Sequence, residues 1–131
     1  MSNFRKLRVW ELSSELGQKA FEVSVEIQTS FNRDMCKQLR RSSASIAANI
    51  SEADDHESAL EKARFLQYSV ASASETENHI QALRDINSMS YKDFEDLMKR
   101  LVSVRRMLRK LLERVRERIP PEKQPADKRR T

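Results

Sequence analysis

Apolar residues recur along the chain at spacings of three and four residues, the pattern of a helix that buries one face. Short polar segments interrupt this pattern. It therefore predicts four helices, at about residues 7–30, 33–53, 57–87 and 91–119. Because the connections are short, successive helices should run antiparallel in an up-down-up-down four-helix bundle. The expected fold class is all-α, with one domain at residues 1–119 and a disordered basic tail at residues 120–131.

Residues at the predicted helix boundaries support this division. Asn32, Asp54 (with Glu57) and Ser90 precede helices and are of the types that cap helix N-termini. The only glycine is Gly17, so the turn glycines of a β-sheet protein are lacking. In the first helix, two aromatic residues beside the apolar stripe should widen the buried face. They are Trp10 and Phe21.

The predicted second helix contains a run of small residues, SSASIAA, from Ser42 to Ala48. Small side chains let another helix approach closely. Together with a broad, mixed apolar face on the third helix, this run offers more packing surface than one bundle needs. We therefore expect a homo-oligomer.

Charge is distributed unevenly. Of 25 basic and 20 acidic residues, 13 basic and only 4 acidic residues lie from Lys99 onward. A basic C-terminal third on a weakly acidic body is typical of a protein with a polyanionic partner. A helix face that carries charge only for solubility gives the same composition, so the sequence leaves both interpretations open.

The basic residues of the fourth helix fall into rows. Arg105, Arg109 and Arg116 lie beside the core stripe, and Arg106 and Lys110 form the neighbouring row. The planar guanidinium of arginine suits phosphate oxygens, which predicts a nucleic-acid-binding face. No aromatic side chains accompany these rows, so backbone contacts are expected rather than base recognition. Other cations should extend the face, namely Arg5, Lys6 and Arg8 in the first helix and Lys128, Arg129 and Arg130 in the tail.

Two carboxylates in the middle of the third helix, Glu75 and Glu77, should point about 200° apart. One of them should therefore face the interior or a subunit contact. Arg40 or Arg41, midway along the antiparallel second helix, is a natural partner. We expect a structural ion pair here, with a ligand-binding role as the alternative.

The residue pattern gives little basis for catalysis. His56 and His79 are the only histidines. Glu75 and His79 are four residues apart and could share one helix face, but di-iron bundles need two Glu-x-x-His copies and neither is present. Cys36 has no evident base and should be a small buried thiol. We expect a protein that is not an enzyme and binds no metal or other cofactor. Without a bilayer-spanning apolar segment or a signal-peptide core, a cytoplasmic location with no membrane partner is expected.

Several segments together form a recognisable pattern. Residues 4–10 are FRKLRVW, and residues 38–53 are QLRRSSASIAANISEA. They resemble the Phe-x-x-Leu-x-Val-Trp start and the second-helix signature of the bacterial four-helix-bundle family named for proteins encoded in 23S rRNA intervening sequences. The third helix matches the family pattern at Phe65-Leu66, Ser72 and Glu75-x-Glu77. The usual proline and two glycines of the family are replaced by Ala47, Ala53 and Ala71.

The resemblance implies a four-helix bundle that assembles as a homopentameric ring and has no catalytic residues. The family is similar to Avd, the accessory protein of diversity-generating retroelements, which binds nucleic acid and a reverse transcriptase. The sequence and the resemblance together leave two classes of function open. One is a nucleic-acid-binding accessory protein with RNA or DNA and a reverse transcriptase as partners. The other is a structural or protein-interaction scaffold, and a protein carried in an rRNA intervening sequence is a third context.

Overall fold

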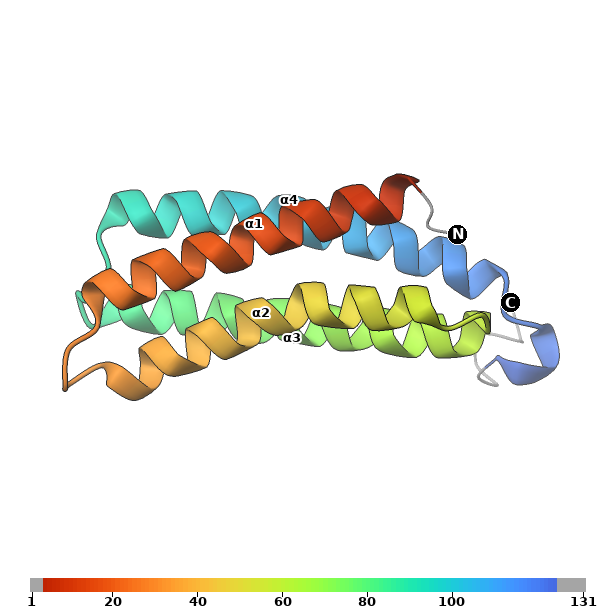
Figure 1. Ribbon diagram of the computed structural model, residues 1–131, viewed down its shortest axis with the longest axis horizontal. Helices are drawn as coiled ribbons and strands as arrows, with labels where there is room; N and C mark the ends of the chain where they lie inside the picture. Colours follow the sequence, from red (N-terminus) through yellow and green to blue (C-terminus); the bar gives the residue numbers. More distant parts are fainter. Residues whose placement is uncertain (1–3, 125–131) are drawn as a thin grey trace.

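The computed structural model describes the backbone of residues 4–124 and the side chains of residues 8–124. Its long helices are α1 Phe4–Ile27, α2 Arg33–Asp55, α3 Ala59–Asp85 and α4 Tyr91–Glu117. Each helix packs against the next in the chain, and α1 also packs against α4, so the four surround one core (Figure 1). No strand occurs in the described part of the chain. The predicted all-α four-helix bundle is confirmed.

The connection between α1 and α2 is organised by one side chain. Asn32 occupies the position before α2, but its side chain makes no capping hydrogen bond there. Instead its Nδ2 donates to Ile27 O at 3.0 Å, and its Oδ1 accepts from Thr29 N at 2.7 Å. Asn32 therefore stands at the N-cap position of α2, as predicted, but its side chain does not cap that helix. It folds back over the end of α1, which ends at Ile27 and not at the predicted residue 30.

The turn between α2 and α3 also differs from the prediction. Asp54 does not start a helix with Glu57, because α2 continues through it to Asp55. The N-cap of α3 is Ser58, whose Oγ accepts from Glu61 N at 3.4 Å. Ser58, the residue after Glu57, has an extended backbone conformation and caps α3 in place of the predicted Asp54.

The helix that carries most of the candidate site is fixed at both ends. Ser90 Oγ accepts from Asp93 N at 3.1 Å, which confirms Ser90 as the N-cap of α4. After α4 the chain makes a single turn of 3₁₀ helix, η1 Pro121–Lys123, and Gln124 Nε2 donates to Ile119 O at 2.9 Å. The start of the predicted disordered tail is therefore folded. Residues 125–131, including Lys128, Arg129 and Arg130, lie outside the described residues.

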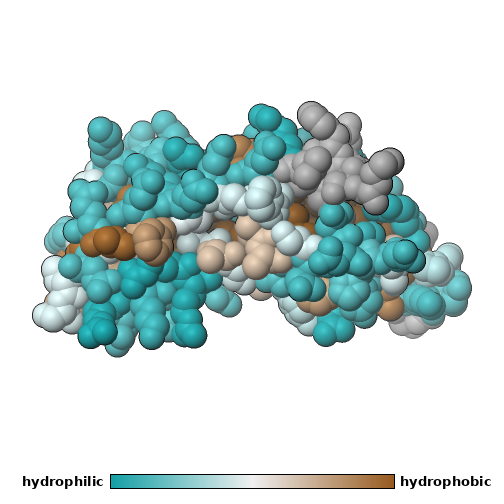
Figure 2. Space-filling view, in the orientation of Figure 1, coloured by the Kyte–Doolittle hydropathy of each residue, from teal (hydrophilic) through white to brown (hydrophobic). Residues whose placement is uncertain are grey.

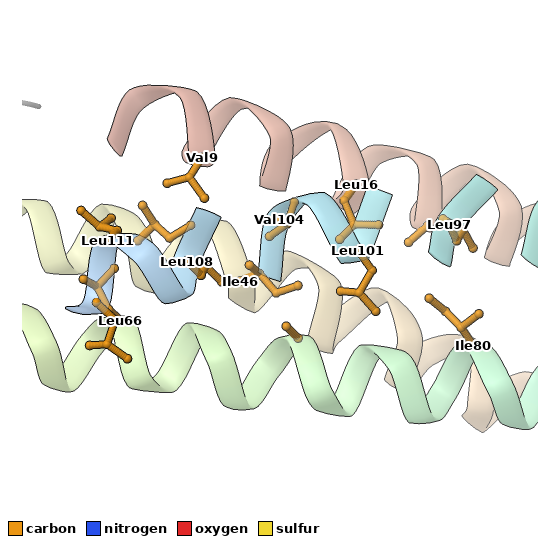
Figure 3. Packing of buried hydrophobic residues seen from close by; sticks show 14 of the residues in the cluster. Val9, Leu16, Ile46, Leu66, Ile80, Leu97, Leu101, Val104, Leu108 and Leu111 are labelled. Carbon is orange, nitrogen blue, oxygen red and sulfur yellow. The ribbon is translucent and has the colours of Figure 1, made fainter. Parts of the chain in front are cut away.

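Leucine and isoleucine side chains from all four helices meet in one continuous core (Figure 3). Where α2 meets α3, however, hydroxyl side chains replace large apolar ones. Ser69 Oγ donates to Ile46 O at 2.7 Å, and Thr76 Oγ1 lies 3.0 Å from Ser42 Oγ. The close helix approach predicted from the small-residue run is confirmed.

The first helix approaches α2 closely as well. A Cβ on Gly17 would lie only 3.7 Å from Ser43 O. The large rings on the flank of α1 are not covered by this approach, since Trp10 and Phe21 are 40% and 56% exposed. The prediction that these aromatic residues widen the buried face is wrong.

Candidate nucleic-acid interface

One side of α4 lies in the core and the other faces solvent. Its buried residues are Leu97, Leu101, Val104, Leu108, Leu111, Leu112 and Val115. Between Lys99 and Leu112 every charged residue is positive. Because the apolar positions of this stretch point inward, its cations are directed toward the outer surface and toward the flanks shared with neighbouring helices.

Ion pairs within α4 neutralise the first cations of this stretch. Lys99 Nζ lies 3.3 Å from Glu95 Oε1, and Arg100 Nε lies 3.1 Å from Asp96 Oδ2. Both pairs join residues four apart, which are neighbours on a helix surface. These pairs were not predicted from the sequence, although the four-residue spacing of opposite charges is the signal that reveals them.

Arg105 is anchored to α3. Its Nη2 donates to Glu77 Oε1 at 2.8 Å and to Ala73 O at 3.3 Å, and only 18% of its side chain is exposed. The ion pair is partly open to solvent, so its contribution to stability is at most about 1 kcal/mol. The guanidinium that was predicted to bind a phosphate is therefore already engaged by a carboxylate.

This contact corrects the ion pair predicted for the third helix. Glu77 pairs with Arg105 rather than with Arg40 or Arg41, because its position on α3 faces α4. One carboxylate of the two, Glu77, does form an ion pair between helices, but its side chain is 42% exposed and not directed into the interior, and the helix that supplies the partner is different.

The arginines of α2 make other contacts. Arg40 extends toward α1, where its Nη1 donates to Ser24 Oγ at 3.1 Å and to Gln28 Oε1 at 2.9 Å. Glu75 and Arg41 are both exposed, and no ion pair joins them in the described part of the chain. The neutral partners of Arg40 tie α2 to α1, so this arginine still has a structural role.

Between Lys99 and Leu112, three cations have no ion-pair partner among the described residues. Arg106, Arg109 and Lys110 are all exposed. With Arg105 and Val102 they line an open depression of about 400 Å³. We refer to Arg105, Arg106, Arg109 and Lys110 as the α4 basic surface. The structure thus brings together four of the residues that the sequence predicted as one face.

The other predicted members of the face are less closely associated. Arg116 Nη2 donates to Gln67 Oε1 at 2.7 Å, and this neutral partner leaves its charge uncompensated. Arg8 is exposed near the start of α1, at the same end of the bundle as the end of α4 (Figure 1). The side chains of Arg5 and Lys6 lie outside the described residues, so their part in the face stays a prediction.

Groups with catalytic or metal-binding potential are sparse. Cys36 is buried, as predicted, and desolvation raises the pKa of its thiol despite the nearby charge of Arg40. Within residues 8–124, no three His, Cys, Asp or Glu side chains gather closely enough to hold a metal ion. None of the described helices combines the length and hydrophobicity that crossing a bilayer requires.

Comparison with known proteins identifies the family. The family model described as 23S rRNA-intervening sequence protein matches residues 5–110. The chain belongs to this family. The matched span ends at Lys110, so it includes the whole α4 basic surface and excludes Arg116.

A solved structure supports the fold. A protein of unknown function from the S23 ribosomal protein family of Bacteroides thetaiotaomicron superposes with a TM-score of 0.71 and 23% sequence identity. The match covers 79% of this chain and 97% of that chain, which shows a shared fold. A search among curated proteins finds no significant match. Neither the family description nor that of the solved structure names a catalytic activity.

Proposed function

We propose that this chain is a non-enzymatic nucleic-acid-binding protein that contacts the phosphate backbone with its α4 basic surface. The observation that carries the proposal is the distribution of ion pairs along α4. Lys99 and Arg100 are neutralised within the helix, whereas Arg106, Arg109 and Lys110 have no ion-pair partner among the described residues. A cluster of uncompensated cations creates the positive potential that attracts a polyanion.

The arrangement of these side chains suits phosphate groups. Arg106 and Lys110 are one helical turn apart, about 6 Å along the axis, and Arg109 lies beside them. No carboxylate lines the depression between them, so an anion that enters it meets only positive and apolar groups. The guanidinium groups of Arg106 and Arg109 can each donate two parallel hydrogen bonds to phosphate oxygens.

Binding of this kind should depend little on base sequence. The residues that line the depression include no aromatic ring on which a base could stack. RNA and DNA duplexes should therefore both bind. In the homopentamer that the family resemblance implies, five copies of the surface would act together, and avidity would strengthen individually weak contacts. A reverse transcriptase as protein partner stays a prediction.

The salt dependence of binding tests this function. Fluorescence anisotropy of a labelled short RNA duplex and a matched DNA duplex would give the binding constant at several salt concentrations. Each phosphate contact contributes about −0.9 to the slope of log affinity against log salt concentration, so three contacts predict a slope of about −3, or steeper if several subunits engage. Absence of binding at low salt, or an affinity that does not change with salt, would contradict the proposal and favour a protein-interaction scaffold.

A further inference from the structure

A group of aromatic side chains and one arginine lies near the turn between α2 and α3. The ring of Phe65 stacks on that of His56, with 4.8 Å between the ring centroids, and meets the ring of Tyr68 edge to face at 5.6 Å. The guanidinium carbon of Arg64 lies 5.7 Å from the centroids of both the Phe65 and the Tyr68 rings. We call His56, Arg64, Phe65 and Tyr68 the α3 aromatic cluster.

Two members of this cluster are open to solvent and held in place. The side chain of Arg64 is 58% exposed, and Tyr68 is 43% exposed. Arg64 Nε donates to Tyr68 Oη at 2.9 Å, so the guanidinium and the phenol ring are fixed relative to each other. Glu61 Oε2 lies 3.4 Å from Arg64 Nη1, but this ion pair is exposed and therefore weak. The cluster thus presents a preorganised surface of the kind on which nucleobases stack.

Exposed rings elsewhere on the molecule lack such a cation. Trp10 and Phe21 are exposed on α1. Figure 2 shows hydrophobic surface along the side formed by α1 and α2, bordered above and below by hydrophilic surface. No described arginine lies over the ring of Trp10 or Phe21. Because a ring without a cation offers a polyanion no electrostatic attraction, the α3 aromatic cluster suits a nucleic acid better.

The α3 aromatic cluster adjoins the line of cations on α4. Arg116 Nη2 donates to Gln67 Oε1 at 2.7 Å, and Gln67 directly precedes Tyr68 in α3. The start of α3 and the end of α4 lie at the same end of the bundle (Figure 1). Arg116 follows Arg109 by about 10 Å along the helix axis, which is about three steps of a stacked strand. One exposed carboxylate, Glu113, lies between these two arginines in the sequence, so this path carries more positive than negative charge.

From these features we infer that the α3 aromatic cluster binds an unpaired base adjacent to the duplex that the α4 basic surface holds. The unpaired base stacks on the ring of Tyr68, and the guanidinium of Arg64 contacts the adjoining phosphate. Stacking tolerates any sequence, because every base has a π-face, and so it agrees with the backbone contacts of α4.

This inference rests on the proposed function, since the α4 basic surface supplies the duplex contacts. It adds the class of ligand, which is a nucleic acid whose duplex continues into a single strand. The cluster and the α4 basic surface belong to different helices and share no residue. Stacking and duplex binding can therefore be removed by separate substitutions.

Anisotropy titrations of three RNA ligands with the full chain test the stacking. The first ligand is a blunt duplex, and the second carries a short single-stranded extension, placed in turn at either end of a strand. The third has the same extension with abasic sites, which keep the phosphates and remove the bases. The wild-type protein should bind the extension with bases about tenfold more tightly than the abasic one. A fluorescent base analogue in the extension should show the quenching that accompanies stacking.

Substitutions at tyrosines separate stacking from charge. Tyr68→Leu should abolish the preference for bases and leave the affinity for the blunt duplex unchanged, whereas Tyr68→Phe should keep the preference because it retains the ring. The matched control is Tyr91→Leu. It removes a 61% exposed tyrosine that also lies beside an arginine, Arg84, at the opposite end of the bundle, and it should behave like wild type. Circular dichroism should show equal helix content in all four proteins.

Equal affinity of the wild-type protein for extensions with and without bases would overturn the inference. So would a preference that persists in Tyr68→Leu, or one that is lost equally in Tyr91→Leu. If the blunt duplex still binds in a salt-dependent manner, the proposed function stands in each of these cases, and the cluster is left as a surface for a protein partner. Absence of binding to all three ligands would contradict the proposed function as well.

Discussion

Replacing Arg106 and Arg109 with glutamate is expected to weaken binding to RNA and DNA duplexes by about a hundredfold at 0.1 M salt. Each lost phosphate contact removes about 0.9 log unit of affinity at this salt concentration, and the new carboxylates repel the phosphates. The slope of log affinity against log salt concentration should also become shallower by about 2. Anisotropy titrations of both duplexes measure the two effects, and the loss should be similar for all base sequences.

The choice of residues and of the control follows from the structure. Arg105 is left intact because a glutamate there would face Glu77 across a distance that is now 2.8 Å. The double variant Lys92→Glu with Lys123→Glu changes the net charge by the same amount at exposed positions outside the α4 basic surface. It should lose only a small part of the affinity. Equal losses in the two double variants would show that overall charge, and not this surface, determines binding.

Replacing Leu101 with alanine is expected to destabilise the bundle by about 2–5 kcal/mol. Leu101 is fully buried among core residues of several helices (Figure 3), so truncation removes apolar contacts and leaves a cavity that rigid neighbouring helices fill poorly. Urea unfolding at a fixed protein concentration measures the change, since association also contributes to apparent stability.

The adjacent residue supplies the control for this prediction. Val102 is 47% exposed on the same turn of α4, and Val102→Ala should change the free energy of unfolding by no more than about 0.5 kcal/mol. Similar losses of stability for both variants would mean that Leu101 and Val102 do not differ in burial, so that α4 is rotated differently about its axis. The cations of α4 would then not all lie on its outer surface.

The fold was predictable because apolar spacing records which side of each helix is buried. That spacing places Leu101 and Leu108 inside without any knowledge of the other helices. It could not place Trp10 and Phe21, because they lie at the edge of the apolar stripe, where exposure depends on whether a neighbouring helix covers the position. Helix ends were predicted less well for a similar reason. Asn32 is a capping residue type, but its side chain forms hydrogen bonds with Ile27 O and Thr29 N at the end of the preceding helix and not with the start of α2.

The candidate site was predictable only in part. Spacing along one helix was enough to group Arg105, Arg106, Arg109 and Lys110, which line one depression. The partner of Arg105 depends on how α3 and α4 are rotated about their axes, and a single sequence does not contain that information. The predicted pairing of one of Glu75 and Glu77 with Arg40 or Arg41 failed for this reason. As a result, the cations available to a ligand are fewer than the sequence indicated.

Mapping the contact by NMR tests the central claim most directly. A short RNA duplex would be titrated into isotopically labelled full-length protein while the backbone amide signals and the arginine Nε signals are followed. We predict that the largest shifts occur between Val102 and Lys110, with the side-chain signals of Arg106 and Arg109 among them, and that they diminish as salt is added. Shifts concentrated instead on α2, around Arg33, Lys37 and Arg41, or no shifts on α4 at saturation, would contradict the assignment of the α4 basic surface as the nucleic-acid interface.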